Sequence, residues 1–265
     1  MAFSFIQITD HHLRAAETDL VRGMSTDNSL RTVLRHIARH AAPRADFIVS
    51  MGDFIDPPSE AAYMAVLSRL SVERNGAAPP GPLQISSEGL RAFPIYFMPG
   101  NHDDRDAFFR CLFPEAAPMP LMNVRFEYQS VQFICLDWGT DATSVVYPET
   151  LDFLTRALQT DLPSVILTHH QVAPVGVAWL DAFIAPEMPR FWEIVRGKRV
   201  IGILAGHVHM THEQLVAGIP VLTLRSTAFQ FARNDEPLIA LEPPHYRFVT
   251  IHNDVLTSRI FEVPL

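Results

Sequence analysis

Short apolar runs that end in polar residues recur along this chain, and they are the feature that most constrains its fold. Each run has the length of a buried strand, at residues 3–8, 46–51, 94–99, 131–138, 164–169 and 199–206. Between them, apolar residues recur with helical spacing over residues 28–41, 60–72, 103–112, 149–159 and 186–196. Strands that alternate with helices predict an α/β protein whose sheets are covered by helices.

The C-terminal part of the chain changes character. Residues 211–218, 219–226, 246–253 and 255–263 are predicted to be consecutive strands, with Asn253-Asp254 as a turn. The Gly- and Pro-rich residues 75–89 are predicted to form an exposed loop. Residues 1–265 are expected to form one domain, in which residues 226–265 supply a cap and the last strands.

Composition narrows the classes of partner. The chain of 265 residues is 48% hydrophobic, enough for a sizeable core. Its net charge of −8 has no long run of either sign, which argues against nucleic acid or an anionic membrane as the main partner. Cys111 and Cys135 cannot form a disulfide framework, so a reducing, cytoplasmic setting is expected. No basic N-terminal region precedes an apolar one, and no apolar stretch reaches about 18 residues, so neither a signal peptide nor a membrane span is expected.

Polar side chains follow the predicted strands and form a candidate metal site. In α/β folds the carboxyl ends of strands are where ligands bind. Imidazole combined with carboxylate and amide oxygen suits Mn, Fe, Zn or Co, whereas an oxygen-only set would suggest calcium or magnesium. Singly, each motif has an ordinary alternative, since Gly-Asp after a strand is more often a turn. The side chains at these ends are Asp10, His12, Asp53, Asn101, His102, His169, His207 and His209.

Together, the order D-x-H, G-D, G-N-H-D, H and G-H-x-H resembles the calcineurin-like metallophosphoesterase superfamily over nearly the whole chain. His169-His170, the stretch STAFQF at 226–231 and Tyr246-Arg247 are similar to its bacterial branch of class III cyclic-nucleotide phosphodiesterases and glycerophosphodiester phosphodiesterases. The resemblance implies a four-layer αββα sandwich, in which helices flank two mixed β-sheets.

The resemblance also implies a binuclear centre of two divalent transition-metal ions. One ion would be held by Asp10, His12 and His209, and the other by Asn101, His169 and His207, with Asp53 bridging both. The implied reaction is hydrolysis of a small phosphodiester by a metal-bridging hydroxide. An amide ligand at Asn101 adds no charge, so the site stays net positive and attracts a phosphate diester.

The two residues that follow Asn101, His102 and Asp103, are candidate catalytic residues. The resemblance places His102 beside the phosphate, as a general acid or an electrostatic stabiliser of the transition state. Asp103 has two interpretations. It would hydrogen-bond a ligand histidine, such as His12, and fix its tautomer, or it would cap the helix that follows.

Other polar residues near the motifs have ordinary interpretations. His11 and His170 each adjoin a predicted ligand, and neighbours on an extended chain point to opposite faces. Both are interpreted as structural or as supporting a ligand, His170 being the better candidate for substrate contact. His36 and His40 fit a surface pair on a helix. Substrate recognition would fall to rim loops at residues 13–26, 170–185 and 226–246. Asp56, Asp104 and Asp106 are interpreted as loop carboxylates, and Arg14, Arg22 and Arg105 as exposed cations within reach of a substrate.

The leading hypothesis is therefore a binuclear metallophosphodiesterase acting on a cyclic nucleotide or a glycerophosphodiester. A phosphomonoesterase or nucleotide pyrophosphohydrolase on the same site is the enzymatic alternative. A non-catalytic scaffold is the alternative from another class, although the complete ligand set counts against it. The resemblance leaves a homo-oligomer, a dimer or larger, open.

Overall fold

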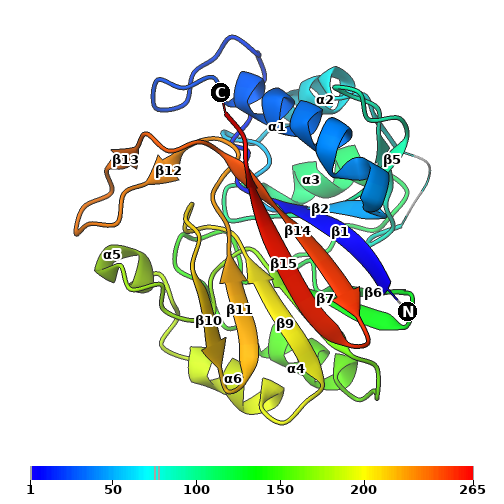
Figure 1. Cartoon of the computed structure of the whole chain (residues 1–265), viewed down its shortest axis with the longest axis vertical. Coiled ribbons are helices and arrows are strands. Elements are labelled where there is room, and N and C mark those ends of the chain that lie inside the picture. The colour runs from blue at the N-terminus through cyan, green and yellow to red at the C-terminus, as the bar shows by residue number, and fades with distance from the viewer. Residues whose placement is uncertain (1, 75, 77, 265) are drawn as a thin grey trace.

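The computed structural model describes residues 2–74, 76 and 78–264, which form two large sheets packed face to face (Figure 1). The first sheet has the order β15-β14-β1-β2-β5-β4-β3. Its central strands β1, β2 and β5 are parallel, and antiparallel strands extend it on both sides. In chain order its strands are β1 (Ala2–Ile8), β2 (Phe47–Met51), β3 (Val72–Glu73), β4 (Leu83–Ile85), β5 (Phe93–Met98), β14 (His245–His252) and β15 (Val255–Glu262).

The second sheet has the order β10-β11-β9-β8-β7-β6. Strands β11, β9, β8 and β7 run parallel, while β10 and β6 are antiparallel edges. A separate two-stranded ribbon pairs β12 (Gln230–Phe231) with β13 (Ile239–Ala240). The strands of the second sheet are β6 (Val124–Tyr128), β7 (Val131–Leu136), β8 (Ser164–Thr168), β9 (Val200–Ala205), β10 (Glu213–Val216) and β11 (Ile219–Thr223).

Helices cover the outer faces of the two sheets (Figure 1). On the first sheet lie α1 (Thr26–His40), α2 (Glu60–Arg69) and α3 (Arg105–Leu112), and α1 leads into a short 3-10 turn, η1 (Ala42–Arg44). On the second lie α4 (Pro148–Ala157) and α6 (Met188–Val195), whereas the short α5 (Ala178–Asp181) stands apart from both. The predicted αββα sandwich with two mixed sheets is confirmed.

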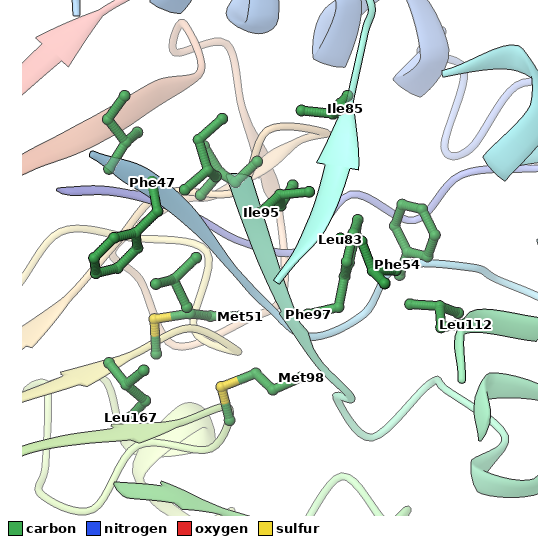
Figure 2. Packing of buried hydrophobic residues seen from close by; sticks show 14 of the residues in the cluster. Phe47, Met51, Phe54, Leu83, Ile85, Ile95, Phe97, Met98, Leu112 and Leu167 are labelled. Carbon is green, nitrogen blue, oxygen red and sulfur yellow. The ribbon is translucent and has the colours of Figure 1, made fainter. Parts of the chain in front are cut away.

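Aromatic rings fill the space between the sheets. Phe5 and Phe47 of the first sheet stack at 5.2 Å, and Phe133 of the second meets Phe5 edge-on at 5.4 Å. Figure 2 shows Met51 and Leu167 approaching one another across the same interface. Burial of such rings supplies the main attraction between the layers.

Local sequence signals set the ends of the elements. Ser25 caps α1 by accepting a hydrogen bond from the Asn28 amide, as a serine before a helix commonly does. The predicted Asn253-Asp254 turn is confirmed, since both residues have positive φ, of 49° and 63°, between β14 and β15. The exposed loop predicted at residues 75–89 is wrong in part, because β4 lies within it with Leu83 and Ile85 buried. Residues 75 and 77 lie outside the described residues.

The C-terminal strands divide between the sheets and do not form one unit. β10 and β11 complete the second sheet, whereas β14 pairs with β1 in the first. The intervening residues 224–244 cross the edge where the carboxyl ends of the parallel strands lie. Within the described ranges, no helix combines the length and the apolar character needed to cross a membrane.

Candidate metal centre

Strand ends from both sheets deliver the candidate ligands to one place. β1, β2 and β5 lead to Asp10, His12, Asp53 and Asn101, while β8 and β9 of the other sheet lead to His169, His207 and His209. Most of these side chains are buried. Their donor atoms fall into two groups suited to a metal ion that share Asp53, and a third group joins His12 to Asp56 and His102.

The first group combines Asp10, His12 and His209 with Asp53. The Nε2 atom of His209 lies 3.3 Å from Oδ1 of Asp10 and 3.2 Å from Nε2 of His12. Nε2 of His12 is also 3.6 Å from Oδ2 of Asp53. All four side chains are buried, so a cation here would be enclosed on the protein side by two carboxylates and two imidazoles.

The second group combines His169 and His207 with Asp53. Nε2 of His169 lies 3.3 Å from Oδ1 of Asp53. The amide oxygen of Asn101 is 3.0 Å from Nε2 of His169 and 2.9 Å from Nδ1 of His207, which adds it to this group. The two oxygens of Asp53 thus face different groups, as a bridging carboxylate requires.

Hydrogen bonds at the far side of two rings decide what these rings present to the centre. Nδ1 of His209 lies 2.7 Å from the carbonyl oxygen of Phe229, and Nδ1 of His169 lies 2.9 Å from that of Met51. A carbonyl only accepts, so Nδ1 carries a proton in each ring, and Nε2 is the atom that can give up a proton and present a lone pair to a metal ion. Deprotonated Nε2 atoms converging on carboxylate and amide oxygens would be repelled by them unless a cation, a proton or a metal ion, lies between. The donor set therefore fits divalent metal ions.

Charge within the cluster keeps both carboxylates ionised. Burial works to raise the pKa of Asp10, but the facing imidazoles of His209 and His169 outweigh it and hold the pKa below its usual range. Burial also works to raise the pKa of Asp53, but His169 outweighs it, and the pKa of Asp53 is well below normal. Although burial opposes it, Asp53 and Asp10 raise the pKa of His169 to about 9. Without a metal, a proton on an imidazole thus supplies the positive charge that the carboxylates require.

The backbone at the ligands is unusual. Asp10, His12, Asp53, His207 and His209 all have positive φ, between 44° and 67°. Residues other than glycine seldom adopt this left-handed conformation, and such residues cluster at functional sites where the fold holds them in place. The turns at the strand ends thus direct the candidate ligands toward the centre, at a cost in local backbone energy.

Gly52 and Gly100 make the close approach of two strand ends possible. A Cβ atom on Gly52 would lie 2.7 Å from the Cα atom of Gly100, and one on Gly100 would lie 2.8 Å from the His169 ring. Real Cβ atoms do not approach so closely, and Gly52 also has a φ of 96°. The glycine before Asp53 and the glycine before Asn101 are therefore steric requirements of the site.

His102 stands at the edge of the centre, with its side chain 43% exposed. Its backbone amide donates to Oδ1 of Asp53, and its Nδ1 lies 3.5 Å from Oδ1 of Asp56. The Asp56 carboxylate raises the pKa of His102 to about 9, against the opposing effect of burial. With Nδ1 directed at Asp56, Nε2 is the ring atom left for a substrate.

Asp56 is a site residue that the sequence analysis missed. Its other oxygen lies 3.4 Å from Nδ1 of His12, so one carboxylate serves two imidazoles. The two histidines hold the pKa of Asp56 far below its usual range, His102 having the larger effect. Asp56, and not Asp103, is therefore the carboxylate that lies beside Nδ1 of His12. The available signal was its position three residues after Asp53, in the same loop.

Both sequence-based interpretations of Asp103 need correction. Its carboxylate accepts hydrogen bonds from the Phe54 and Gly100 amides and from the Tyr63 hydroxyl, not from His12. The cap of α3 is Asp104, whose side chain accepts from the Ala107 amide at 2.7 Å. Burial raises the pKa of Asp103. Asp103 thus joins the loop after β2 to the loop after β5.

Several neighbouring side chains prove to be structural. The His11 ring is buried between the hydroxyls of Thr227 and Ser50, and burial lowers its pKa to about 3. This agrees with the structural interpretation. Arg105, predicted to be exposed and within reach of a substrate, is instead buried in a two-bond ion pair with Asp137. It belongs to the scaffold beneath the site.

The predicted rim loops do enclose a cavity of about 340 Å³ above the centre. Residues 13–26 contribute Val21 and Arg22, and the loop after β8 contributes Trp179 and Phe183. Residues 226–246 contribute Phe229, Phe231 and Pro237. His102, Asp53 and Asn101 form part of the floor. His170 is buried with Nε2 against the Asp141 carbonyl oxygen, 2.9 Å away, and so lies behind the cavity wall.

Two stacked sheets whose strand ends meet in a buried cluster of imidazoles and carboxylates are typical of metal-dependent hydrolases with an αββα fold. Residues 3–211 match the family described as calcineurin-like phosphoesterase, and the chain belongs to that family. The match covers the strand ends that carry every candidate ligand.

Named relatives cover almost the whole chain. A 3',5'-cyclic adenosine monophosphate phosphodiesterase of Vibrio vulnificus is 27% identical, over 98% of this chain and 89% of its own length. A 3',5'-cyclic-nucleotide phosphodiesterase of Nostoc sp. is also 27% identical, over 100% and 94%. Among solved structures, a dimetal phosphatase from Danio rerio has a TM-score of 0.64 at 14% identity, covering 99% of both chains. The Plasmodium protein GAP50, an anchor in the inner membrane complex, has a TM-score of 0.62 at 12% identity, covering 99% and 85%. These two structures share the fold.

Proposed function

We propose that this protein is a binuclear metal-dependent phosphodiesterase that hydrolyses small phosphodiesters, with 3',5'-cyclic nucleotides as substrates. The observation that carries the proposal is the pair of ligand groups sharing Asp53 beneath an open cavity. The curated relatives named as cyclic-nucleotide phosphodiesterases cover this chain almost completely, which supports the substrate class.

In this proposal Asp10, His12 and His209 would hold one divalent ion, and Asn101, His169 and His207 would hold a second. Asp53 would be a ligand of both. Divalent ions bound there would supply Lewis-acid activation of water and of the phosphoryl group. Mn, Fe, Zn and Co all suit this mixture of imidazole, carboxylate and amide donors.

Charge at the site favours an anionic diester. The two ligand groups together hold two carboxylates, Asp10 and Asp53, so two divalent cations leave a net positive centre. Asn101 contributes to this excess because its amide oxygen carries no charge. A phosphodiester, with a single negative charge, is then attracted to the cavity floor.

His102 serves the leaving group. Asp56 holds Nδ1 of its ring, while the exposed part of the side chain lines the cavity. A proton on Nε2 can pass to the departing alkoxide oxygen, or remain on the ring and offset the developing negative charge. Asp103 keeps the loop that carries His102 in register with the loop that carries Asp53, and thus acts by positioning.

The test combines metal content with turnover. After reconstitution with Mn²⁺ or Fe²⁺, we expect about two metal ions per chain and hydrolysis of bis(p-nitrophenyl) phosphate faster than of p-nitrophenyl phosphate. Cyclic AMP should be hydrolysed to a monophosphate that accumulates. Less than about one ion per chain, with no turnover of either aryl ester, would overturn the proposal.

A further inference from the structure

An apolar corner of aromatic rings forms one side of the cavity. Trp179 and Phe183 come from α5 and the residues that follow it, and Phe229 and Phe231 come from the segment before and within β12. The Trp179 and Phe231 rings are perpendicular, with centroids 5.0 Å apart. Phe229 and Phe231 are also nearly perpendicular, at 5.6 Å. Two distant parts of the chain thus build one wall.

The aromatic corner adjoins the metal ligands directly. The ring of His209 lies 4.6 Å from that of Phe229 and 4.9 Å from that of Phe231. On the other side, Phe183 lies 5.7 Å from His207. A substrate whose phosphate sits over the centre can therefore place its adjoining group against these rings.

The rings are held firmly but are not fully covered. Trp179, Phe183 and Phe231 are half-buried and pack against a small apolar cluster that includes Val208 and Met210, beside the metal ligands. Their backs are fixed by this cluster while part of each ring borders the cavity. Rigid aromatic surface left open in a cavity is typical of a site for a flat, apolar ligand group.

Arg22 completes the wall. Its guanidinium lies over the rings of Phe229 and Phe231, 5.2 Å and 5.7 Å from their centroids. The planar cation caps the aromatic corner and offers donors toward the acceptors of a heterocycle. Two carboxylates, Asp53 and Asp56, also border the cavity.

We infer that Trp179 and Phe231 form the subsite for the nucleobase, and that they make the enzyme select diesters with a planar heterocycle beside the phosphate. This inference rests on the proposed function and deepens it. In a corner of perpendicular rings, a base that stacks on one ring meets the other edge-on, and both arrangements are favourable. The glycerol of a glycerophosphodiester would bring hydroxyl groups against apolar rings, where they lose hydrogen bonds to water.

The test compares cyclic AMP with an abasic analogue, the methyl ribofuranoside 3',5'-cyclic phosphate, on the metal-loaded enzyme. Both carry the same cyclic diester, so their ratio of kcat/KM reports the contribution of the base. In the wild type we expect cyclic AMP to be favoured by about tenfold or more. Phe231→Leu and Trp179→Leu should each raise the KM for cyclic AMP about fivefold to a hundredfold and move the ratio toward one.

Phe153→Leu is the matched control, because Phe153 is a half-buried phenylalanine that packs on the far side of the second sheet. It should leave the ratio unchanged. Circular dichroism and metal content show whether the Phe231 and Trp179 variants fold. A wild-type ratio near one, or equal ratios in folded variants, would overturn the nucleobase subsite and leave the phosphodiesterase intact. No turnover of either diester by the metal-loaded enzyme would overturn the proposed function itself.

Discussion

The two ligand groups of the centre differ in charge and in exposure. The group of Asp10, His12 and His209 has a carboxylate of its own, and all its side chains are buried. The group of His169 and His207 has the neutral amide of Asn101 in the corresponding place, and Asn101 is only half-buried at the cavity floor. The same fold thus makes one ligand group whose side chains are all buried and one that includes a half-buried amide, and both groups border the cavity.

This difference implies that cations bound by the two groups would be held with different strength. Attraction between a divalent cation and a carboxylate in a buried site is several-fold stronger than in water. A cation in the first group is therefore expected to be held firmly, while one in the second group keeps positive charge available to an incoming phosphate. The predictions below test this division, beginning with the side chain that both groups share.

Asp53→Asn is expected to have the largest effect, because it removes a charged ligand from both groups at once. The amide keeps the size but cannot bridge two cations as a carboxylate does. We expect kcat/KM to fall by more than about a thousandfold, with loss of bound metal measured by elemental analysis. Asp106→Asn, at an exposed position on α3, is the matched control and should retain both properties. Wild-type activity in the Asp53 variant would contradict the bridging role.

Asp10→Asn and Asn101→Ala should separate the two groups. We expect Asn101→Ala to retain about one tightly bound ion per chain, since the first group is intact. Asp10→Asn should weaken the tighter site by at least about tenfold, measured by competition with a chelator. If Asn101→Ala lost its metal as completely as Asp10→Asn did, the asymmetry between the groups would be refuted.

Asp56→Asn should show whether one carboxylate affects both metal binding by the first group and the role of His102. This carboxylate contacts both the ligand His12 and the cavity residue His102. Removing its charge should lower kcat and the metal affinity by about tenfold to a hundredfold, as expected for a residue that orients a ligand. A fall in metal affinity with unchanged kcat under saturating metal would restrict Asp56 to orienting His12.

Features that follow a regular sequence pattern could be predicted, whereas those that depend on the path of a loop could not. The candidate ligands could be expected to lie close together because each follows a recognisable strand, and parallel strands bring their carboxyl ends together. Asp56 could not be placed, since its contacts depend on the path of a loop with no periodic pattern. The cap of α3 was assigned to Asp103 as one interpretation and lies instead at Asp104, because a shift of one residue in the start of α3 moves the cap.

The aromatic corner was even less accessible to sequence analysis. Trp179 and Phe231 are 52 positions apart in the numbering, and their contact depends on how α5 and β12 meet across the cavity. The two loops were correctly predicted to line the rim of the cavity. Which of their side chains would face the substrate required the three-dimensional structure.

The smallest expected effect concerns the residues that support the first group, which lie in the segment after β11. The segment after β11 holds this group through Ser226, whose hydroxyl donates to the Asp10 carbonyl oxygen, and through Phe229, whose carbonyl oxygen accepts from His209. His245, at the start of β14, anchors the segment by accepting a hydrogen bond from the Arg225 amide at 2.8 Å. The support therefore requires a neutral acceptor at His245.

Burial, with smaller contributions from Arg225 and Arg247, lowers the pKa of His245 to about 3. In the unfolded chain its pKa is near 6.5, so between these values the unfolded state binds one more proton and stability rises with pH. Between pH 6.5 and pH 5, this group should cost the wild type about 2 kcal/mol of unfolding free energy.

His245→Gln keeps an acceptor but cannot titrate, so it should lose about 2 kcal/mol less than the wild type over the same interval. Urea unfolding of both proteins at the two pH values, with a chelator present, measures this double difference and cancels the titration of every other group. Equal losses in the two proteins would show that His245 titrates normally in the folded state. The anchor behind the first group would then tolerate charge, and the asymmetry of the centre would have to rest on the ligands alone.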